Sequence, residues 1–526
     1  MLFRSLDETR HIERVLARPR EQLVELGRAR CERDLHGGRG HVNQSETSVN
    51  VLPGYAASMR ETVEREVKLA PGDGFTMPEL GGESLPTRAF VSTYHDTPEF
   101  RLARHRITFR HRIEDGAGLW QLKIPRGDAR LEVERAGPPA VPPAELLALL
   151  PALLRGATLG PVARLRTRRQ VTRVPGAEIA DDSVAILDGQ RVVRRFHEIE
   201  IELLDGGDEK TLRRLEKAVR RAGADGGPFR AKLYRALELE PPTPPVVPTG
   251  SPPGAALALR LQGQAAALLE HDPGTRLGSD PEDLHQLRVA TRRLRAFLRA
   301  GRPLLRTDPT DALRGELGWL GSALGPARDL DVLIEHLRLE SEAVGGAAAE
   351  LVATLEARRV DARTMLLDAL GSGRYLRLLD ALDAFATDLP LVDGEQVSLA
   401  SIWWKETKKL RRAVAALGED PSDEALHAVR IFVKRARYAA ELAAHELGRP
   451  GVAFVDRAKV AQDVLGAHQD ATVGSEQVRS WAQDRADVAA VAAQIIEHER
   501  ARKREARAAW PTAWAKLERA ASRARL

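Results

Sequence analysis

The stretch Glu64-Arg65-Glu66-Val67-Lys68 decides how the first half of the chain is interpreted. Side chains of a β-strand alternate between its two faces, so Glu64, Glu66 and Lys68 are expected to share one face. Two carboxylates beside an ammonium group suit a site that binds a metal ion together with a phosphate. Carboxylate oxygens are hard ligands, which favour Mg²⁺ or Mn²⁺. An ordinary solvent-exposed strand is the competing interpretation, and the remaining strands of the first half favour the site.

The composition indicates a soluble, multidomain protein. The chain has 526 residues, of which 43% are hydrophobic and 29% charged, enough for two or three domains. The net charge is only +5 although Lys and Arg number 80, so any binding of anions must depend on local clusters of basic groups. A single cysteine, Cys31, excludes an internal disulfide and fits a reducing cytoplasm. No apolar run is long enough to span a membrane, so we expect a cytoplasmic protein.

Residues 60–240 predict a β-rich domain whose strands have one charged and one apolar face. Glu198, Glu200 and Glu202 alternate with apolar residues in one segment, and basic residues do so in others. Charged faces of both signs fit a closed antiparallel barrel with a polar lumen. We expect strands at 106–112, 120–124, 131–134, 163–174, 184–187 and 196–204, and helices at 143–154 and 209–222. A lumen of this kind suits a polyanion held together with a metal ion.

The charged motifs of this region resemble those of the CYTH family of triphosphate tunnel metalloenzymes, and they occur in the same order. The motifs are Glu64-x-Glu66-x-Lys68, Tyr94-His95-Asp96-Thr97, Arg110-x-Arg112, Lys123, Arg130-x-Glu132, Glu198-x-Glu200-x-Glu202 and Lys232. One departure is the strand that holds Lys123, which lacks the threonine often found two residues earlier in the family. This departure leaves the substrate preference open but does not affect the predicted fold.

The resemblance implies a role for each matched residue. The catalytic residues are expected to be Glu64, Glu66 and Lys68, and the ligands of Mg²⁺ or Mn²⁺ to be Glu64, Glu66 and Glu200, with Glu202 as a further ligand. The expected substrate-binding residues are Arg110, Arg112, Lys123, Arg166, Arg168 and Lys232. Because sequence cannot fix the register of the strand at 163–174, Arg164 and Arg169 remain alternatives to Arg166 and Arg168.

A proline-rich stretch, residues 241–253, marks the predicted boundary between two domains. Its sequence PPTPPVVPTGSPP disfavours a helix and favours an extended linker. We therefore predict a disordered or loosely helical extension at 1–58, a tunnel domain at 59–240, the linker at 241–253 and a helical domain at 254–526. Met59, just before the first strand, is an alternative start of the chain.

The helical domain contains an internal duplication. Leu284, Leu287, Leu294 and Leu298 follow the three-to-four spacing of a buried helix face, and basic residues lie one position further on. The same pattern recurs 142 residues later, with His427 in the position of His285. A second repeat pairs residues 324–332 with residues 465–473, at an offset of 141. Basic stripes in the same register of both copies predict a shared anion-binding surface beside intact helix cores.

This part of the chain resembles the CHAD domain, which has the pattern His-x-x-Arg-x-x-x-Arg-Arg-x-Arg followed by Leu-Gly-x-x-Arg-Asp. The resemblance implies paired helical bundles that bind inorganic polyphosphate. The implied polyphosphate-binding residues are His285, Arg288, Arg292, Arg293, Arg295, His427, Arg430, Lys434, Arg435 and Arg437. Specific nucleic-acid binding is not expected, because the basic helices lack interleaved aromatic residues for base stacking.

The sequence thus predicts an α+β multidomain protein, with an antiparallel β-tunnel followed by an all-α, duplicated helical-bundle domain. The expected function is metal-dependent hydrolysis of inorganic triphosphate, polyphosphate or another triphosphate, with polyphosphate as the ligand of the helical domain. A location on polyphosphate granules fits this function. The alternatives are a non-catalytic scaffold that binds polyphosphate, and an adenylate cyclase.

Overall fold

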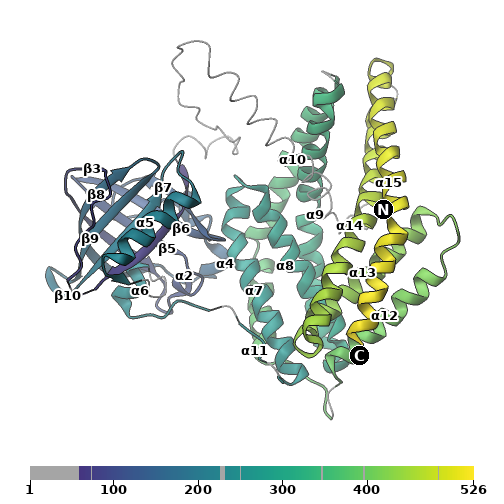
Figure 1. Cartoon of the computed structure of the whole chain (residues 1–526), viewed down its shortest axis with the longest axis horizontal. Helices are drawn as coiled ribbons and strands as arrows, with labels where there is room; N and C mark the ends of the chain where they lie inside the picture. The colour runs from purple at the N-terminus through teal and green to yellow at the C-terminus, as the bar shows by residue number, and fades with distance from the viewer. Residues whose placement is uncertain are drawn as a thin grey trace. The chain divides into compact units, whose positions relative to one another are not determined.

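A computed structural model describes residues 59–72, 74–225, 231–243, 245–248, 250–344, 347–394, 397–483 and 485–525. The extension predicted at 1–58 lies outside these residues. The chain forms two compact units: the described residues up to 243 group with residues 269–279 in the first, and residues 245–268 group with the described residues from 280 onward in the second. The first unit is β-rich and the second is helical (Figure 1). No helix in the described part of the chain is long and apolar enough to cross a membrane.

The first unit is built on one curled antiparallel sheet. In chain order, its strands are β1 (Arg60–Glu64), β2 (Glu66–Pro71), β3 (Glu83–Ser84), β4 (Arg88–Asp96), β5 (Thr108–Glu114), β6 (Ala117–Arg126), β7 (Ala129–Ala136), β8 (Gly160–Val174), β9 (Ala177–Asp188), β10 (Arg191–Leu203) and β11 (Ala224–Asp225). They pair in the order β1-β7-β6-β5-β4-β8-β9-β10-β2-β11, and β3 pairs with β8. Most neighbours in the sheet are therefore consecutive in sequence.

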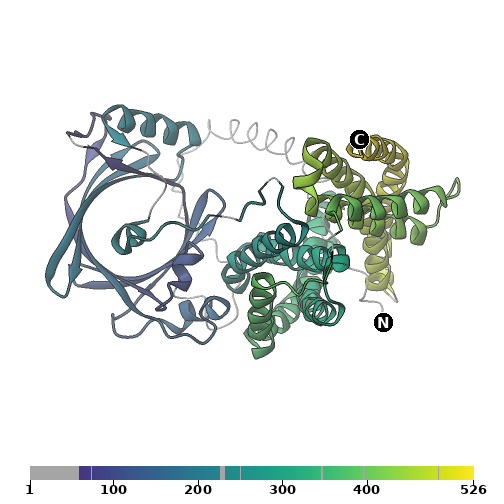
Figure 2. The ribbon, with the colours of Figure 1, turned by 90° about the horizontal axis from the view of Figure 1, so that it is seen from below.

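The sheet curls until its ends meet at the segment that opened the sequence analysis. The sequence predicts one strand there, but the structure has two strands, which meet at Arg65. Glu64 of β1 pairs with Arg130 of β7, and Glu66 of β2 pairs with Glu202 of β10. The carbonyl of Arg65 accepts a hydrogen bond from the amide of Leu203 at 2.9 Å. One continuous segment thus joins both ends of the sheet, which appears as a ring in Figure 2.

Short helices cover the sheet and enter the ring. They are α2 (Arg101–Arg104), α3 (Ala144–Leu147), α4 (Pro151–Leu154), α5 (Glu209–Arg221) and α6 (Lys232–Leu237). The helix predicted at 143–154 is split into α3 and α4 because Pro151 has no amide hydrogen to continue a helix. Helix α5 is capped by the Asp208 carboxylate and buries Leu212, Leu215 and Val219. Helix α6 lies inside the ring (Figure 2).

The second unit is all-helical. Its helices are α7 (Pro253–Leu277), α8 (Pro281–Ala300), α9 (Thr307–Val344), α10 (Ala347–Gly371), α11 (Gly373–Thr387), α12 (Leu399–Ala415), α13 (Asp423–Leu442), α14 (Ala444–Ala482) and α15 (Ala489–Ala524), with 3₁₀ turns at Arg302–Leu304 and Ala486–Val488. Helices α8, α9 and α10 pack in succession, as do α13, α14 and α15. Helix α14 bends at Gly448, whose φ of 56° is typical of glycine.

The predicted duplication has a direct counterpart in the two central helices of this unit. Helices α8 and α13 have the same length, and each end of α13 lies 142 residues after the corresponding end of α8. Each begins with a side-chain cap, from Asp280 in α8 and from Ser422 in α13. The two helices pack against each other and against α9 and α14, respectively. Each therefore has more than one buried face.

Candidate functional site

The interior of the ring contains lysines that are surrounded by carboxylates from several strands. Lys68 forms ion pairs with Glu66, at 2.9 Å, and with Glu200 on the neighbouring strand β10. On the other side of the join between β1 and β2, Lys123 contacts Glu64. The side chains of the five residues are at most 16% exposed. The motif residues of β1, β2, β6 and β10 therefore converge inside the ring.

A second group of charges joins β8, β9 and β10 to helix α6. Arg169 holds Asp182 with a two-pronged contact, at 2.8 and 2.6 Å, and also contacts Glu200. Lys232 of α6 lies 2.8 Å from Asp182, 2.8 Å from Glu198 and 2.6 Å from Glu200. Glu200 thus links both groups of charges, and α6 places a cation inside the ring.

Two arginines of β5 extend the basic lining of the interior. Arg110 donates from Nε to Gln121 Oε1 at 2.8 Å and from Nη1 to the hydroxyl of Tyr94 at 3.2 Å. Arg112 forms an ion pair with Glu114 on the same strand. Neutral partners hold Arg110 in place but do not cancel its charge. Arg110 can therefore offer a positive charge to an anion inside the ring.

The charges of this interior stabilise one another strongly. Burial opposes ionisation of Glu200, but Lys232, Lys68 and Arg169 outweigh it and hold the pKa of this carboxyl well below its ordinary value. In turn, the carboxylates overcome the effect of burial on Lys232 and Lys68 and raise the pKa of each ammonium. These groups therefore remain charged across the physiological pH range.

Glu202 differs from the other interior carboxyls. Burial raises its pKa to about 7, and the nearby negative charges of Glu64, Glu66 and Glu200 add to the shift although Lys123 opposes it. Like charges gathered in this way favour either a proton or a cation. Glu66 Oε1 is also buried and has no hydrogen-bond partner in the described part of the chain. The join between β1 and β2 therefore has acceptor oxygens that a divalent cation could use.

These residues fit a metal ion that is bound jointly with a phosphate. The described residues contain no group of three or more His, Cys, Asp and Glu arranged to hold a metal by themselves. Magnesium usually takes one or two carboxylates and completes its shell with water and substrate phosphates. Glu66 Oε1, which has no hydrogen-bond partner among the described residues, and the raised pKa of Glu202 fit this mode of binding.

The structure corrects the predicted register of the strand at 163–174. Arg166 and Arg168 lie on the exposed side of β8, whereas Arg169, which the sequence left as an alternative, faces the interior. Arg164 lies near the surface, where it reaches the carbonyl of Gly189. The segment has basic residues of both parities, so alternation alone cannot select the inner set.

The hydrogen bonds of Asp96 indicate a structural role. Its carboxylate accepts hydrogen bonds from the amides of Thr97, Leu102 and Ala103 at 2.7 to 2.9 Å. These bonds join the end of β4 to α2. Asp96 is 1% exposed, so it supports the wall of the ring.

A pH prediction follows from Glu202. Its folded-state pKa of about 7 exceeds the ordinary value of 4.5, so ionisation of the folded state destabilises it increasingly as pH rises from about 4.5 to about 7. We expect Glu202→Gln to raise the stability of metal-free protein at pH 8 by up to about 3 kcal/mol and to have little effect at pH 4.5. Urea unfolding at both pH values measures this difference. An equal effect at both would contradict the assignment.

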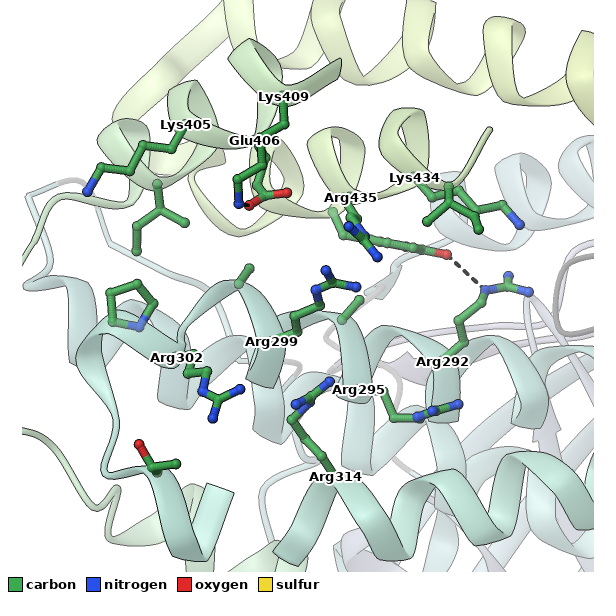
Figure 3. Close-up of a pocket in the computed structure, with 17 residues that line it drawn as sticks. Arg292, Arg295, Arg299, Arg302, Arg314, Lys405, Glu406, Lys409, Lys434 and Arg435 are labelled. Carbon is green, nitrogen blue, oxygen red and sulfur yellow. Dashed lines mark hydrogen bonds and ion pairs between the residues drawn. The ribbon is translucent and has the colours of Figure 1, made fainter. Parts of the chain in front are cut away.

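The helical unit contains a pocket of about 690 Å³ with a strongly basic lining (Figure 3). The described lining includes nine cationic side chains and one carboxylate, Glu406. The cations come from α8, the turn after it, α9, α12 and α13, and they are Arg292, Arg295, Arg299, Arg302, Arg314, Lys405, Lys409, Lys434 and Arg435. Glu406 pairs with Lys409, which belongs to the same helix. The pocket thus presents a large excess of positive charge.

Arg299 shows how densely this charge is gathered. Although much of the residue is exposed, removal of water from its guanidinium lowers its pKa, and the charges of Arg435 and Arg314 add to this effect. Arg292 is held in place by the hydroxyl of Tyr438, which accepts a hydrogen bond from Nε at 2.9 Å (Figure 3). Such a site binds anions with many charges because each phosphate relieves repulsion between neighbouring cations.

The pocket includes four of the ten residues that the sequence predicts for polyphosphate, namely Arg292, Arg295, Lys434 and Arg435. The other six lie elsewhere. Arg288 pairs with Asp329, Arg293 and Arg437 pair with Glu441, His427 contacts Gln469, and His285 and Arg430 are buried. The expectation that the basic stripes lie wholly beside the helix cores is therefore wrong, because α8 packs against two helices and α13 against three.

Five of the basic residues that line the pocket were not predicted from the sequence to be site residues. They are Arg299, Arg302, Arg314, Lys405 and Lys409. Arg299 continues the basic spacing of α8, and Lys405 and Lys409 lie one turn apart on α12, so a signal for these three was present. Arg302 and Arg314 follow no repeat, and only the fold brings them to the pocket.

The buried pair of Arg288 and Asp329 leads to a prediction about stability. The two side chains meet at 2.6 Å and are 5% and 18% exposed. Arg288→Met leaves a half-buried carboxylate without this partner, which we expect to destabilise the helical unit by about 3 kcal/mol. Arg338→Met, at an exposed position, is the matched control. Equal unfolding free energies of the two variants, combined with loss of polyphosphate binding in Arg288→Met alone, would instead support a direct binding role.

Comparison with known proteins agrees with this division into a tunnel and a helical unit. Residues 62–226 match the model of the CYTH domain, and residues 259–479 match that of the CHAD domain. The chain belongs to the family of proteins in which a CYTH domain is followed by a CHAD domain. The CYTH match implies the triphosphate tunnel fold, and members of that family are typically triphosphatases or cyclases.

Relatives and solved structures cover different shares of the chain. The uncharacterized protein MT2285 of Mycobacterium tuberculosis is 33% identical over 433 residues, which cover 75% of this chain and 82% of the relative. PptA from Streptomyces chartreusis is similar over 50% of this chain and 100% of its own, with 26% identity and a TM-score of 0.43. The CHAD domain from Ricinus communis is similar over 56% of this chain and 96% of its own, with 28% identity and a TM-score of 0.46.

Proposed function

We propose that the tunnel unit is a metal-dependent hydrolase of inorganic triphosphate or polyphosphate, and that the helical unit binds polyphosphate. The proposal for the tunnel unit rests on the interior of the ring, where cations from several elements face a group of carboxylates. Such an interior suits a chain of phosphates accompanied by a divalent cation. The proposal that the helical unit binds polyphosphate rests on its basic pocket.

In the proposed mechanism, residues of the ring bind and orient the phosphate chain. Arg110 and Arg169 offer guanidinium groups that can contact phosphate oxygens in pairs, and Lys123 and Lys232 offer ammonium groups. Arg169, Lys123 and Lys232 are now held by interior carboxylates, which an incoming phosphate chain would displace, whereas Arg110 is held by neutral partners. Because these cations remain charged, they can stabilise the charge that develops on the transferred phosphoryl group.

The metal is proposed to bind at the join between β1 and β2, through Glu64, Glu66, Glu200 and Glu202. When bound, Mg²⁺ or Mn²⁺ would neutralise phosphate charge and favour attack by water. Glu66 has the buried oxygen that lacks a hydrogen-bond partner in the described part of the chain, so it is the foremost proposed ligand. Glu200 also holds Lys68 and Lys232, so it links the metal site to the basic lining.

Polyphosphate is favoured over nucleic acid as the ligand of the basic pocket. Among the described lining residues, Tyr438 is the only aromatic one, and its hydroxyl is engaged by Arg292. Proteins that bind single-stranded nucleic acids usually stack bases on several aromatic rings. A lining of guanidinium and ammonium groups can recognise phosphates without base stacking on aromatic rings.

A substrate panel tests the proposed activity. Inorganic triphosphate, long-chain polyphosphate, thiamine triphosphate and ATP are each incubated with the full chain and Mg²⁺ or Mn²⁺, and both phosphate and cyclic AMP are measured. We expect phosphate release from triphosphate or polyphosphate that stops when the metal is chelated. Formation of cyclic AMP would favour a cyclase, and binding without turnover of any substrate would favour a scaffold.

A further inference from the structure

The duplication of the helical unit raises the question of whether the basic pocket has a counterpart. Arg292 and Arg435 line the pocket, and the residues 142 positions away from them are Lys434 and Arg293. The residue that corresponds to the pocket arginine Arg299 is Glu441, at the end of α13. One repeat therefore has a cation at this position, and the other has a carboxylate.

Glu441 lies at the centre of a group of arginines. Arg293 and Arg437 each form an ion pair with it at 3.5 Å, and the charges of Glu441 and Arg293 both act on Arg260 of α7. The side chain of Glu441 is 15% exposed and that of Arg437 is 3% exposed. The carboxylate of Glu441 thus lies among three guanidinium groups that come from α7, α8 and α13, and the charge of Asp463 also acts on Arg437.

The hydrogen bonds of this group are incomplete. In the described part of the chain, the buried Nε atoms of Arg260, Arg293 and Arg437 have no hydrogen-bond partner, and neither does Glu441 Oε1. Buried arginine donors are normally satisfied by acceptors. Glu441 balances the charge in part, but it does not reach these donors with good geometry. The tetrahedral arrangement of oxygens on a phosphate offers acceptors in more directions than a carboxylate does.

We propose that Arg260, Arg293 and Arg437 form a second, latent phosphate-binding site that Glu441 keeps closed. This inference rests on the proposed binding of polyphosphate by the basic pocket. The duplication then gives the helical unit two phosphate-binding sites, one in each repeat. The basic pocket is open because it has Arg299, and the second site is closed because it has Glu441 at the corresponding position.

The test introduces Glu441→Gln into a full chain whose basic pocket has been disabled by Arg299→Gln, Lys405→Gln and Lys409→Gln. Binding of long-chain polyphosphate is measured at several salt concentrations. We expect the added substitution to tighten binding at least about tenfold, which corresponds to one charge-assisted contact. Glu441→Asp, which keeps the charge, is expected to restore nothing.

Two further variants make the outcome decisive. Glu316→Gln releases Arg374 from its ion pair on the surface, so it adds the same net charge elsewhere in the unit. Glu441→Arg introduces the arginine that the first repeat has at this position. It replaces Glu441→Gln in the binding test if that variant fails to fold. The inference is overturned if neither substitution of Glu441 regains binding, or if Glu316→Gln regains as much. If the wild type and all variants fail to bind, the proposed function fails as well.

Discussion

Neutralising the exposed cations of the basic pocket is expected to weaken the binding of long-chain polyphosphate at least about a hundredfold. The pocket variant combines Arg299→Gln, Lys405→Gln and Lys409→Gln, all at exposed positions of α8 and α12. Each charge-assisted contact contributes about 1.5–3 kcal/mol when well formed, so the loss of two already explains this change. Equilibrium titration at fixed ionic strength measures it. The salt dependence of binding should also become shallower, because fewer cations are displaced from the ligand.

The matched control removes the same number of positive charges from other exposed positions of the helical unit. Arg338→Gln, Arg500→Gln and Arg504→Gln change exposed residues that do not belong to the described lining of the pocket. We expect this surface variant to bind nearly as tightly as the wild type. Equal weakening in both variants would mean that net charge, and not the pocket, determines binding.

The second large effect is expected at the join between β1 and β2. Glu66→Gln keeps the size of the side chain and removes the charge of the foremost proposed metal ligand. Metal ions contribute several kcal/mol of charge stabilisation to phosphoryl transfer, so we expect metal-dependent turnover of triphosphate to fall at least about a hundredfold. Initial rates of phosphate release across a range of Mg²⁺ or Mn²⁺ concentrations measure the loss.

Glu61→Gln is the matched control for the tunnel. Glu61 belongs to the same strand as Glu64, but it is exposed. We expect this variant to have wild-type rates and an unchanged requirement for metal. If Glu66→Gln retains wild-type rates while its melting temperature is also unchanged, the proposed metal assignment is wrong.

The tunnel could be predicted in large part because its motifs alternate on strands. Glu198, Glu200 and Glu202 all face the interior, since β10 keeps a strict period of two over this stretch. The predicted choice between Arg168 and Arg169 failed because neighbouring basic residues fit either face. Closure at Arg65 was also not predictable, because it depends on β7 and β10, which are distant in sequence.

The duplication of the helical unit could be predicted from the sequence, but the full set of residues that line its basic pocket could not. Periodicity placed the basic stripes of α8 and α13 next to their apolar stripes, yet it could not show that each helix packs against more than one other helix. Arg288 is consequently engaged with Asp329 instead of lining the pocket. Lys405 and Lys409 belong to α12, which the repeat pattern does not include. The composition of the pocket is therefore a property of tertiary packing.

The most direct test of the account compares a long and a short substrate in the pocket variant. The measurement is the ratio of kcat/KM for long-chain polyphosphate to kcat/KM for inorganic triphosphate, in the full chain with saturating metal. If the helical unit binds the long polyanion while the tunnel carries out hydrolysis, this ratio falls in the pocket variant and the rate with triphosphate is retained. An unchanged ratio, or an equal loss with both substrates, would contradict this separation of roles.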